Sequence, residues 1–194
     1  MYTQYIKTTI MLLFLFTVLL GGLYPALITI ILQNTSKHKA NGSLITRNNA
    51  IIGSELIGQE FKELKYFWAR PSAISPYPYD PISSTGSNLS PANPKLIALI
   101  HERVNHLHKT NPDNTLPPPI DLVTASASGL DPDISIASAY YQINRVARER
   151  KMTTDEIKAI VDKQITPKQF GLFGHPRVNV TQLNLELDRV SRRS

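Results

Sequence analysis

The chain has 194 residues, no cysteine, 42% hydrophobic residues and a formal net charge of +6. The absence of cysteine excludes a disulfide framework, thiolate metal sites and a cysteine nucleophile. The length suits one or two domains of about 100–200 residues each. An excess of basic residues can indicate an anionic partner such as nucleic acid. Whether it does so here depends on where the charges lie along the chain.

The charges are unevenly distributed along the chain, because Lys7 is the only charged residue before Lys37. The apolar run between them exceeds the roughly 20 residues that a membrane-spanning helix needs. A cleaved signal peptide has a shorter apolar core of about 7–15 residues and a small-residue cleavage site, whereas residues 30–32 are bulky. The sequence therefore predicts a single uncleaved membrane helix within residues 1–36. A short N-terminus before such a run is typical of a signal anchor, with the N-terminus cytoplasmic and the following domain outside.

Gly21 and Gly22 lie inside this run, followed closely by Tyr24 and Pro25. Small residues let a neighbouring helix approach closely, and a proline kink is tolerated where a partner covers the freed carbonyl. We predict a helix-docking region here. The alternative interpretation of Tyr24 and Pro25 is an interfacial aromatic and a mild kink.

Residues 37–49 are polar and are predicted to form a juxtamembrane linker, and residues 50–194 a single α+β domain. β-type residues predict strands within residues 50–61 and at residues 66–68, the second ending before Pro71. Residues 72–93 are rich in proline and are predicted to be a long loop. Loops of this length are usually functional or form an interface. An ordered surface loop without such a role is the alternative interpretation.

Helix signals follow the loop. Ser90-Pro91 and Asn93-Pro94 each offer a cap followed by proline at the first turn. Apolar residues then recur at helical spacing through residue 107, and Thr153 with Glu156 forms a capping box. The leucines of residues 183–190 fit a strand or a helix, and helix is favoured. One further helical face is formed by Ile136, Tyr140, Ile143 and Ala147, with Asp133 or Ser135 as its cap.

Few residues suggest catalysis. His101, His106 and His108 are not spaced to place three ligands on one helix turn, which favours a solvated face over a metal site. Ser36 and Lys39 match a Ser-x-x-Lys pattern, but without the Ser-Asp-Asn element that accompanies it in penicillin-recognising enzymes. No phosphate-binding loop, dinucleotide fingerprint or nucleophile elbow is present.

The basic residues of 145–151 fall in the last turns of a predicted helix, where cations complement the helix dipole. We interpret them as surface charges at a helix end. On this interpretation the basic residues do not indicate nucleic acid as a partner.

Residues 124–135 form a polar stretch of small residues, Thr-Ala-Ser-Ala-Ser-Gly-Leu-Asp-Pro-Asp-Ile-Ser. Small residues pack backbone closely, Gly129 permits unusual dihedral angles, and Asp131 and Asp133 can cap a following helix. We predict a tight connection from a strand to a helix. Two carboxylates alone make a poor site for a hard cation.

This stretch, preceded by Pro-Ile-Asp-Leu-Val at residues 119–123, resembles the hallmark of the KdpC family, the small subunits of the Kdp potassium-transporting ATPase. The resemblance covers essentially the whole chain in order. The further matching segments are Gly22 with Tyr24-Pro25, Gly53-Ser54 with Leu56-Ile57-Gly58-Gln59, Phe67 with Arg70-Pro71-Ser72-Ala73, Ser84 with Gly86-Ser87-Asn88-Leu89, Asn93-Pro94, Tyr141-Gln142 with Arg145-Val146-Ala147, Gly171 with Gly174-His175-Pro176, Val178-Asn179-Val180, Leu183-Asn184-Leu185 and Leu187-Asp188.

The resemblance implies an accessory subunit that is not catalytic by itself and has no cofactor or metal of its own. In that family the complex handles ATP and potassium, through a P-type subunit that hydrolyses ATP and a channel-like subunit that binds potassium. These two subunits and the bacterial cytoplasmic membrane are the implied partners. The small subunit is thought to stabilise the complex, and it has been proposed as a catalytic chaperone that raises the ATP affinity of the ATP-hydrolysing subunit.

Two other classes remain open: an anchored serine hydrolase using Ser36 with Lys39 or Ser126, and an anchored solute-binding or sensor domain. For the accessory subunit, residues 72–93 and 124–133 are predicted to form the partner contact or its scaffold. The candidate motif or interface residues are Tyr24, Pro25, Arg70, Pro71, Gly86, Ser87, Asn88, Ser126, Ser128, Gly129, Asp131 and Asp133.

Overall fold

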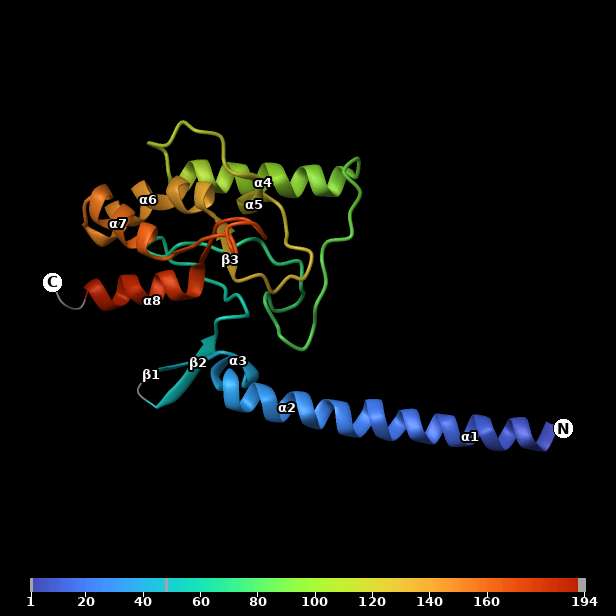
Figure 1. Cartoon of the computed structure of the whole chain (residues 1–194). Coiled ribbons are helices and arrows are strands. Elements are labelled where there is room, and N and C mark those ends of the chain that lie inside the picture. Colours follow the sequence, from blue (N-terminus) through green and yellow to red (C-terminus); the bar gives the residue numbers. More distant parts are fainter. Residues whose placement is uncertain (1, 48, 192–194) are drawn as a thin grey trace. The chain divides into compact units, whose positions relative to one another are not determined.

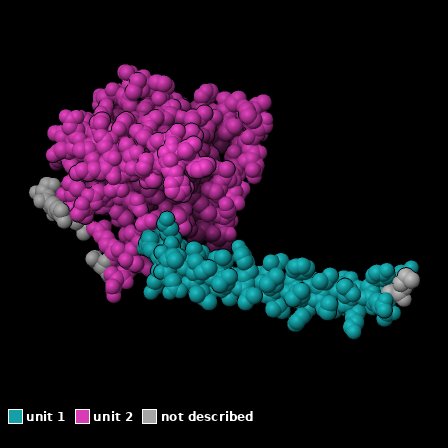
Figure 2. Space-filling model, in the orientation of Figure 1, with its two compact units in different colours: residues 1–44 teal, residues 45–194 magenta. Residues whose placement is uncertain are grey.

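The computed structural model describes residues 2–47 and 49–191. The chain divides into two compact units, residues 1–44 and residues 45–194 (Figure 2). Each unit is described by itself.

The first unit is dominated by one helical rod made of α1 (Tyr2–Val18), a π-helical turn η1 (Leu19–Leu23) and α2 (Tyr24–Thr35). A short helix α3 (Lys37–Ala40) follows. Among the described residues, the 34-residue helix Tyr2–Thr35 is the one that is long and apolar enough to cross a membrane. The predicted N-terminal apolar helix is therefore confirmed.

The π-helical turn lies immediately before Pro25, where a mild kink is one interpretation of the sequence. The Tyr24 backbone N–H donates to the carbonyl of Leu19, five residues back. A proline has no N–H to donate, and its ring crowds the carbonyl four residues earlier. The widened turn is a recognised way for a helix to absorb such a disturbance.

The second unit holds a two-stranded sheet of β1 (Leu44–Arg47) and β2 (Ala50–Ser54), of which Leu44 falls at the unit boundary. The helices α4 (Pro94–Thr110) and α5 (Ile120–Val123) follow. The rest of the unit is β3 (Asp133–Ser135), α6 (Ile136–Arg150), α7 (Thr154–Lys163), β4 (Ile165–Thr166), β5 (Arg177–Asn179) and α8 (Val180–Ser191) (Figure 1). The predicted α+β class is confirmed.

β3, β5 and β4 form a small antiparallel sheet in that order. The fully buried Val178 of β5 is paired with Ile134 on one side and with Ile165 on the other. The sheet thus joins the hallmark segment, which leads into β3, to the C-terminal helix, which leaves β5.

The predicted helix starts are largely confirmed. The Asn93 side chain accepts a hydrogen bond from the backbone N–H of Lys95 at 2.9 Å, so α4 begins there and not at Ser90-Pro91. Thr153 and Glu156 form the predicted capping box of α7. Residues 183–190 lie within α8, which settles the ambiguity in favour of a helix.

The helix α6 is confirmed, with Ser135 as its cap, but its predicted apolar face is partly wrong. Ile143 and Ala147 are buried as predicted, whereas Tyr140 is 39% exposed. The buried face also includes two polar residues, Gln142 and Arg145, which are each 1% exposed. A face containing polar side chains is not recognised by apolar periodicity.

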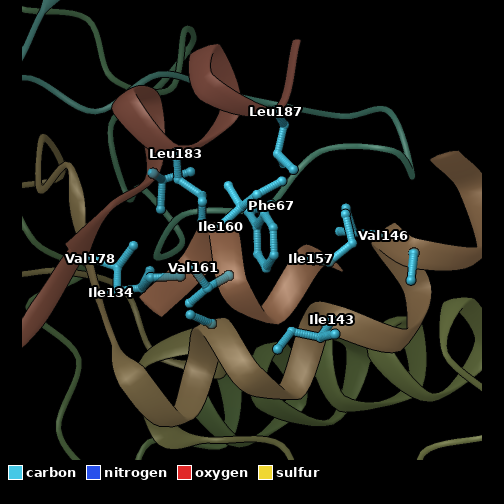
Figure 3. Close-up of a cluster of buried hydrophobic side chains, with 13 residues drawn as sticks. Phe67, Ile134, Ile143, Val146, Ile157, Ile160, Val161, Val178, Leu183 and Leu187 are labelled. Atoms are coloured by element: carbon cyan, nitrogen blue, oxygen red, sulfur yellow. The ribbon is translucent and has the colours of Figure 1, made fainter. Parts of the chain in front are cut away.

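The main core lies between α6, α7, α8 and the small sheet. Figure 3 shows the Phe67 ring among the side chains of these elements. Full burial of such side chains stabilises the fold by about 1.5–3 kcal/mol each. The fully or nearly buried members are Phe67, Ile134, Ala139, Ile143, Val146, Ala147, Ile157, Ile160, Val161, Val178, Val180, Leu183 and Leu187.

The strand predicted at residues 66–68 is wrong, although the segment is extended through the core. Its backbone bonds to side-chain amides instead of a neighbouring strand. The Asn184 Oδ1 accepts from the Phe67 N–H, and the Asn184 Nδ2 donates to the Phe67 carbonyl, both at 2.9 Å. The strand predicted within 50–61 exists only at Ala50–Ser54, and residues 55–93 contain no helix or strand.

Candidate functional site

The hallmark segment, residues 124–135, connects α5 to α6 by way of β3. It is closed by its own hydrogen bonds, since the Ser126 Oγ accepts from the Gly129 N–H at 2.9 Å and the Ser128 Oγ accepts from the Leu130 N–H at 3.1 Å. The tight connection is as predicted, but a short helix and not a strand precedes it.

A second segment, residues 84–86, is docked on the hallmark segment. The Thr85 N–H donates to the Ser128 carbonyl at 3.0 Å, and the Ser84 hydroxyl donates to the same oxygen at 3.2 Å. Gly86 lies against Ala127, because a Cβ at Gly86 would be only 3.0 Å from the Ala127 carbonyl oxygen. The loop of residues 72–93 is therefore held at its middle by residues 127 and 128.

Gly129 is required where these two segments meet. Its φ of +70° lies in the left-handed region that side chains disfavour. A Cβ there would also be 2.7 Å from the Ile74 Cγ1 and 2.8 Å from the Thr85 carbonyl oxygen. Both the backbone conformation and the space exclude a larger residue.

Arg70 and Pro71 approach the hallmark segment from the extended segment that runs through the core. Arg70 Nη1 is 3.2 Å from the Asp131 Oδ2, with both side chains about a third exposed. The Ser126 N–H donates to the Pro71 carbonyl at 3.1 Å. The buried Tyr79 hydroxyl donates to the Arg70 carbonyl, which fastens the first part of the loop of residues 72–93.

The two candidate aspartates are used within the fold. Asp131 Oδ1 accepts from the Asp133 N–H at 3.0 Å, and Asp133 is paired with Arg177 of β5 at 2.7 Å. Burial, together with the nearby Asp131 carboxylate, raises the pKa of Asp133 although Arg177 opposes the shift.

Asp121 fixes the other end of the hallmark segment, a role that the sequence analysis missed. Its carboxylate accepts from the Ser135 N–H at 2.8 Å and from the Ser135 and Ser138 hydroxyls. Burial acts to raise the pKa of Asp121, but the hydrogen bonds from Ser138 and Ser135 outweigh it and lower the pKa. The sequence does contain a sign of this role, because Asp121 is an acid that precedes the capping residue Ser135.

The structure brings most of the candidate residues together. Ser87 and Asn88 differ, since both are exposed on the loop beyond Gly86. Tyr24 and Pro25 belong to the first unit. The residues that form one bonded junction are Arg70, Pro71, Gly86, Ser126, Ser128, Gly129, Asp131 and Asp133.

Gln142 and Arg145 hold the extended segment that leads to Arg70, and the sequence did not predict this role. The Gln142 Oε1 accepts from the Trp68 N–H at 2.8 Å and from Arg145 Nη2 at 2.7 Å. The Arg145 guanidinium lies 3.7 Å from the centroid of the Trp68 ring and donates to the Tyr66 carbonyl at 3.0 Å. Burial lowers the pKa of Arg145 to about 9.

The interpretation of residue 145 as a surface charge at a helix end is therefore wrong. Arg148 donates to the Thr110 carbonyl and pairs with Asp113, and Arg150 pairs with Asp188. These arginines fasten α6 to the segments around it, so their positions are accounted for by the fold.

The junction offers little for a hydrolytic reaction. Ser126 is 2% exposed and its oxygen is engaged by Gly129, which counts against it as a nucleophile. Ser36 precedes the four-residue helix α3 of the other unit. Within residues 2–47 and 49–191, no group of three or more His, Asp or Glu side chains is placed to hold a metal ion.

A groove of about 660 Å³ lies beside the junction. The groove is lined by residues of α4, among them Arg103 and His106, together with Trp68, Arg70 and Tyr79. His106 stacks on Trp68 with ring centroids 5.1 Å apart, so this histidine serves packing.

Comparison with known proteins assigns the family. The family model described as "K+-transporting ATPase, c chain" matches residues 6–189. The chain belongs to the KdpC family.

Individual relatives agree along nearly the whole length. The potassium-transporting ATPase KdpC subunit of Janthinobacterium sp. (strain Marseille) is 51% identical over 173 residues, covering 89% of this chain and 92% of the relative. The protein of the same name from Dechloromonas aromatica (strain RCB) is 48% identical over 187 residues, covering 96% of this chain and 98% of the relative. The resemblance carried by the hallmark segment is thus confirmed, and the chain is a KdpC-type subunit with one candidate membrane anchor.

Proposed function

We propose that this chain is the accessory subunit of an ATP-driven potassium-uptake complex in a bacterial cytoplasmic membrane. Its N-terminus lies in the cytoplasm and its folded domain outside. It stabilises the assembly of the potassium-binding and ATP-hydrolysing subunits, and it has no cofactor of its own. The observation that carries this proposal is the use of the family hallmark: its hydroxyls and carboxylates bond to the chain's own loops instead of forming an open site.

The membrane helix supports the same role. A pathway for ions needs carbonyls or charged rings around an axis, and one helix without a charged residue from Thr8 through Ser36 does not provide them. Among the described residues of the first unit, apart from the adjoining backbone of the helix itself, nothing lies within 4 Å of a Cβ built at Gly21 or Gly22. The two glycines therefore leave space on this helix, which suits the close approach of a partner helix.

The geometry of the junction supports different roles for the two predicted contact segments. The hallmark segment is the scaffold, because Ser126 and Gly129 are buried. The loop of residues 72–93 is the contact, because it is held at Thr85 and Tyr79 while Tyr77 is 72% exposed and Ile82 is 93% exposed. A loop that is fixed by its base and presents apolar side chains is suited to bind a partner without a large ordering cost.

An effect on ATP affinity fits this arrangement only if it is indirect. A domain outside the membrane does not reach a cytoplasmic nucleotide, so the effect has to pass through the packing of the membrane helix on the catalytic subunit. Gly22→Leu is expected to raise the KM for ATP of the assembled complex. Thr17→Leu introduces the same side chain elsewhere in the helical rod, where no glycine is lost, and serves as the control.

The contact is tested by purifying the complex through a tag on this chain. Ile82→Asp and Tyr77→Asp place a charge on the proposed contact, and Leu116→Asp, at a 63% exposed position of another loop, is the matched control. We expect the P-type and channel-like subunits to be lost from the first two variants and retained with the third. Full retention by all three variants would refute the assigned contact, and absence of both subunits with the unaltered chain would refute the accessory role.

A further inference from the structure

An apolar turn lies outside every contact described so far. It comprises residues 169–173, between β4 and β5, and we call it the apolar turn. Phe170 is 84% exposed, Leu172 is 78% exposed and Phe173 is 66% exposed. Three large apolar side chains at one tip form the kind of patch that marks an interaction site.

The turn has a defined conformation. The Gln169 N–H donates to the Phe173 carbonyl at 2.9 Å, and the Phe173 N–H donates back to the Gln169 carbonyl at 3.0 Å. Phe170 and Gly171 both have positive φ, at 53° and 73°. The turn stands on β4 and β5, whose Val178 is fully buried. The apolar side chains are therefore held outward by an ordered backbone.

The stretch of sequence that contains the turn carries charged side chains of one sign. No aspartate or glutamate occurs from Lys163 through Leu185. Lys163 and Lys168 are exposed, and Lys168 immediately precedes the turn. Aromatic and aliphatic side chains flanked by cations, without acids, are the pattern of segments that lie in the interface of an anionic membrane.

The chain itself provides the membrane. Its N-terminal helix is long and apolar enough to anchor it, so the domain is covalently held near a bilayer. Such tethering raises the effective concentration of a second, weak contact and makes it productive. A single turn of three side chains would bind weakly as an isolated segment.

We propose that the apolar turn inserts between the headgroups of the bilayer that anchors the chain, with Lys163 and Lys168 at anionic phosphate headgroups. The turn is then a second attachment point, which limits the rotation of the domain about its membrane helix. This inference goes beyond the proposed function and requires only that the chain is anchored in a membrane.

The absence of cysteine makes a direct test available, because an introduced cysteine is the only thiol in the chain. The full-length Leu172→Cys variant is labelled with an environment-sensitive fluorophore and reconstituted in vesicles of phosphatidylcholine with phosphatidylglycerol. Leu116→Cys, in another exposed loop, is the control. We expect blue-shifted emission and quenching by nitroxide-labelled lipids at residue 172, and neither at residue 116. Both leaflets have the same composition, so the orientation of insertion does not affect the result.

The contributions of apolarity and charge are separated by further changes in the labelled chain. Replacing Phe170 and Phe173 together by serine is expected to abolish the lipid quenching. Reversing the charge of Lys163 and Lys168 is expected to reduce it in anionic vesicles but not in pure phosphatidylcholine, whereas Lys109→Glu leaves it unchanged. Emission at residue 172 that stays as red-shifted and unquenched as at residue 116 would overturn the proposal. A blue shift without lipid quenching that appears only in the assembled complex would also overturn it, because the turn would then bind a protein.

Discussion

The side-chain amide of Asn184 gives the sharpest test of how this domain is stabilised. It replaces a strand partner for Phe67 by accepting from its N–H and donating to its carbonyl, across 117 residues of sequence. Asn184 is 1% exposed and Phe67 is fully buried, so water does not satisfy these backbone groups in the native state. Asn184→Ala therefore leaves a donor and an acceptor unpaired in the core.

The expected cost follows from those two groups. An unsatisfied buried polar group costs about 1–3 kcal/mol, so the pair is expected to lower the free energy of unfolding by about 2–6 kcal/mol. Alanine is also the better helix former, by about 0.5 kcal/mol. Asn144→Ala, at an exposed position of α6, carries the same helix gain without the lost bonds and is the matched control.

The assay is urea unfolding of the full-length chain in a non-ionic detergent. Trp68 is the only tryptophan in the chain and adjoins Phe67, so its fluorescence reports on this segment. We expect Asn184→Ala to unfold at a much lower urea concentration than Asn144→Ala. The dependence of the free energy of unfolding on urea concentration is expected to be the same in both variants. A difference of less than about 0.5 kcal/mol between the two variants, the ordinary range for surface changes, would refute the reasoning.

Two further predictions concern the hallmark segment. Gly129→Ala is expected to destabilise the fold more than Gly171→Ala. Both glycines have a left-handed backbone conformation, which costs about 1–2 kcal/mol for a residue with a side chain. Only at position 129 would the added Cβ also clash with Ile74. Thermal unfolding that gives equal losses would contradict the close packing at Gly129. Folding lowers the pKa of Asp121 below its ordinary 3.8, so its contribution to stability is complete above that pH and is lost as the pH falls through the lower, folded value. The free energy of unfolding, measured between pH 2 and pH 6, is expected to fall less with decreasing pH in Asp121→Asn than in the unaltered chain. An equal fall in both proteins would show that the hydrogen bonds from Ser138 do not favour the charged carboxylate.

The junction contains features that local sequence patterns predict and features that they do not. Gly129 was identified from composition, and its positive φ agrees with that interpretation. The partners of the segment, Thr85 at one side and Pro71 at the other, come from loops without periodicity. The family resemblance included Pro71 and the two neighbours of Thr85, Ser84 and Gly86. Only the tertiary structure showed that the hallmark segment holds the loop of residues 72–93.

Three features were determined by the sequence itself: the long apolar helix Tyr2–Thr35, the cap at Asn93 and the capping box at Thr153. Each depends on neighbours within a few residues or on one uninterrupted run, so the physical cause lies within the pattern. The pairing of Phe67 with Asn184 and the burial of Arg145 were decided only by the tertiary structure. In both cases the polar groups that bond to each other are far apart in the sequence. A polar side chain that will be buried cannot be told from an exposed one in the sequence, because the difference lies in a partner that only the folded chain brings close.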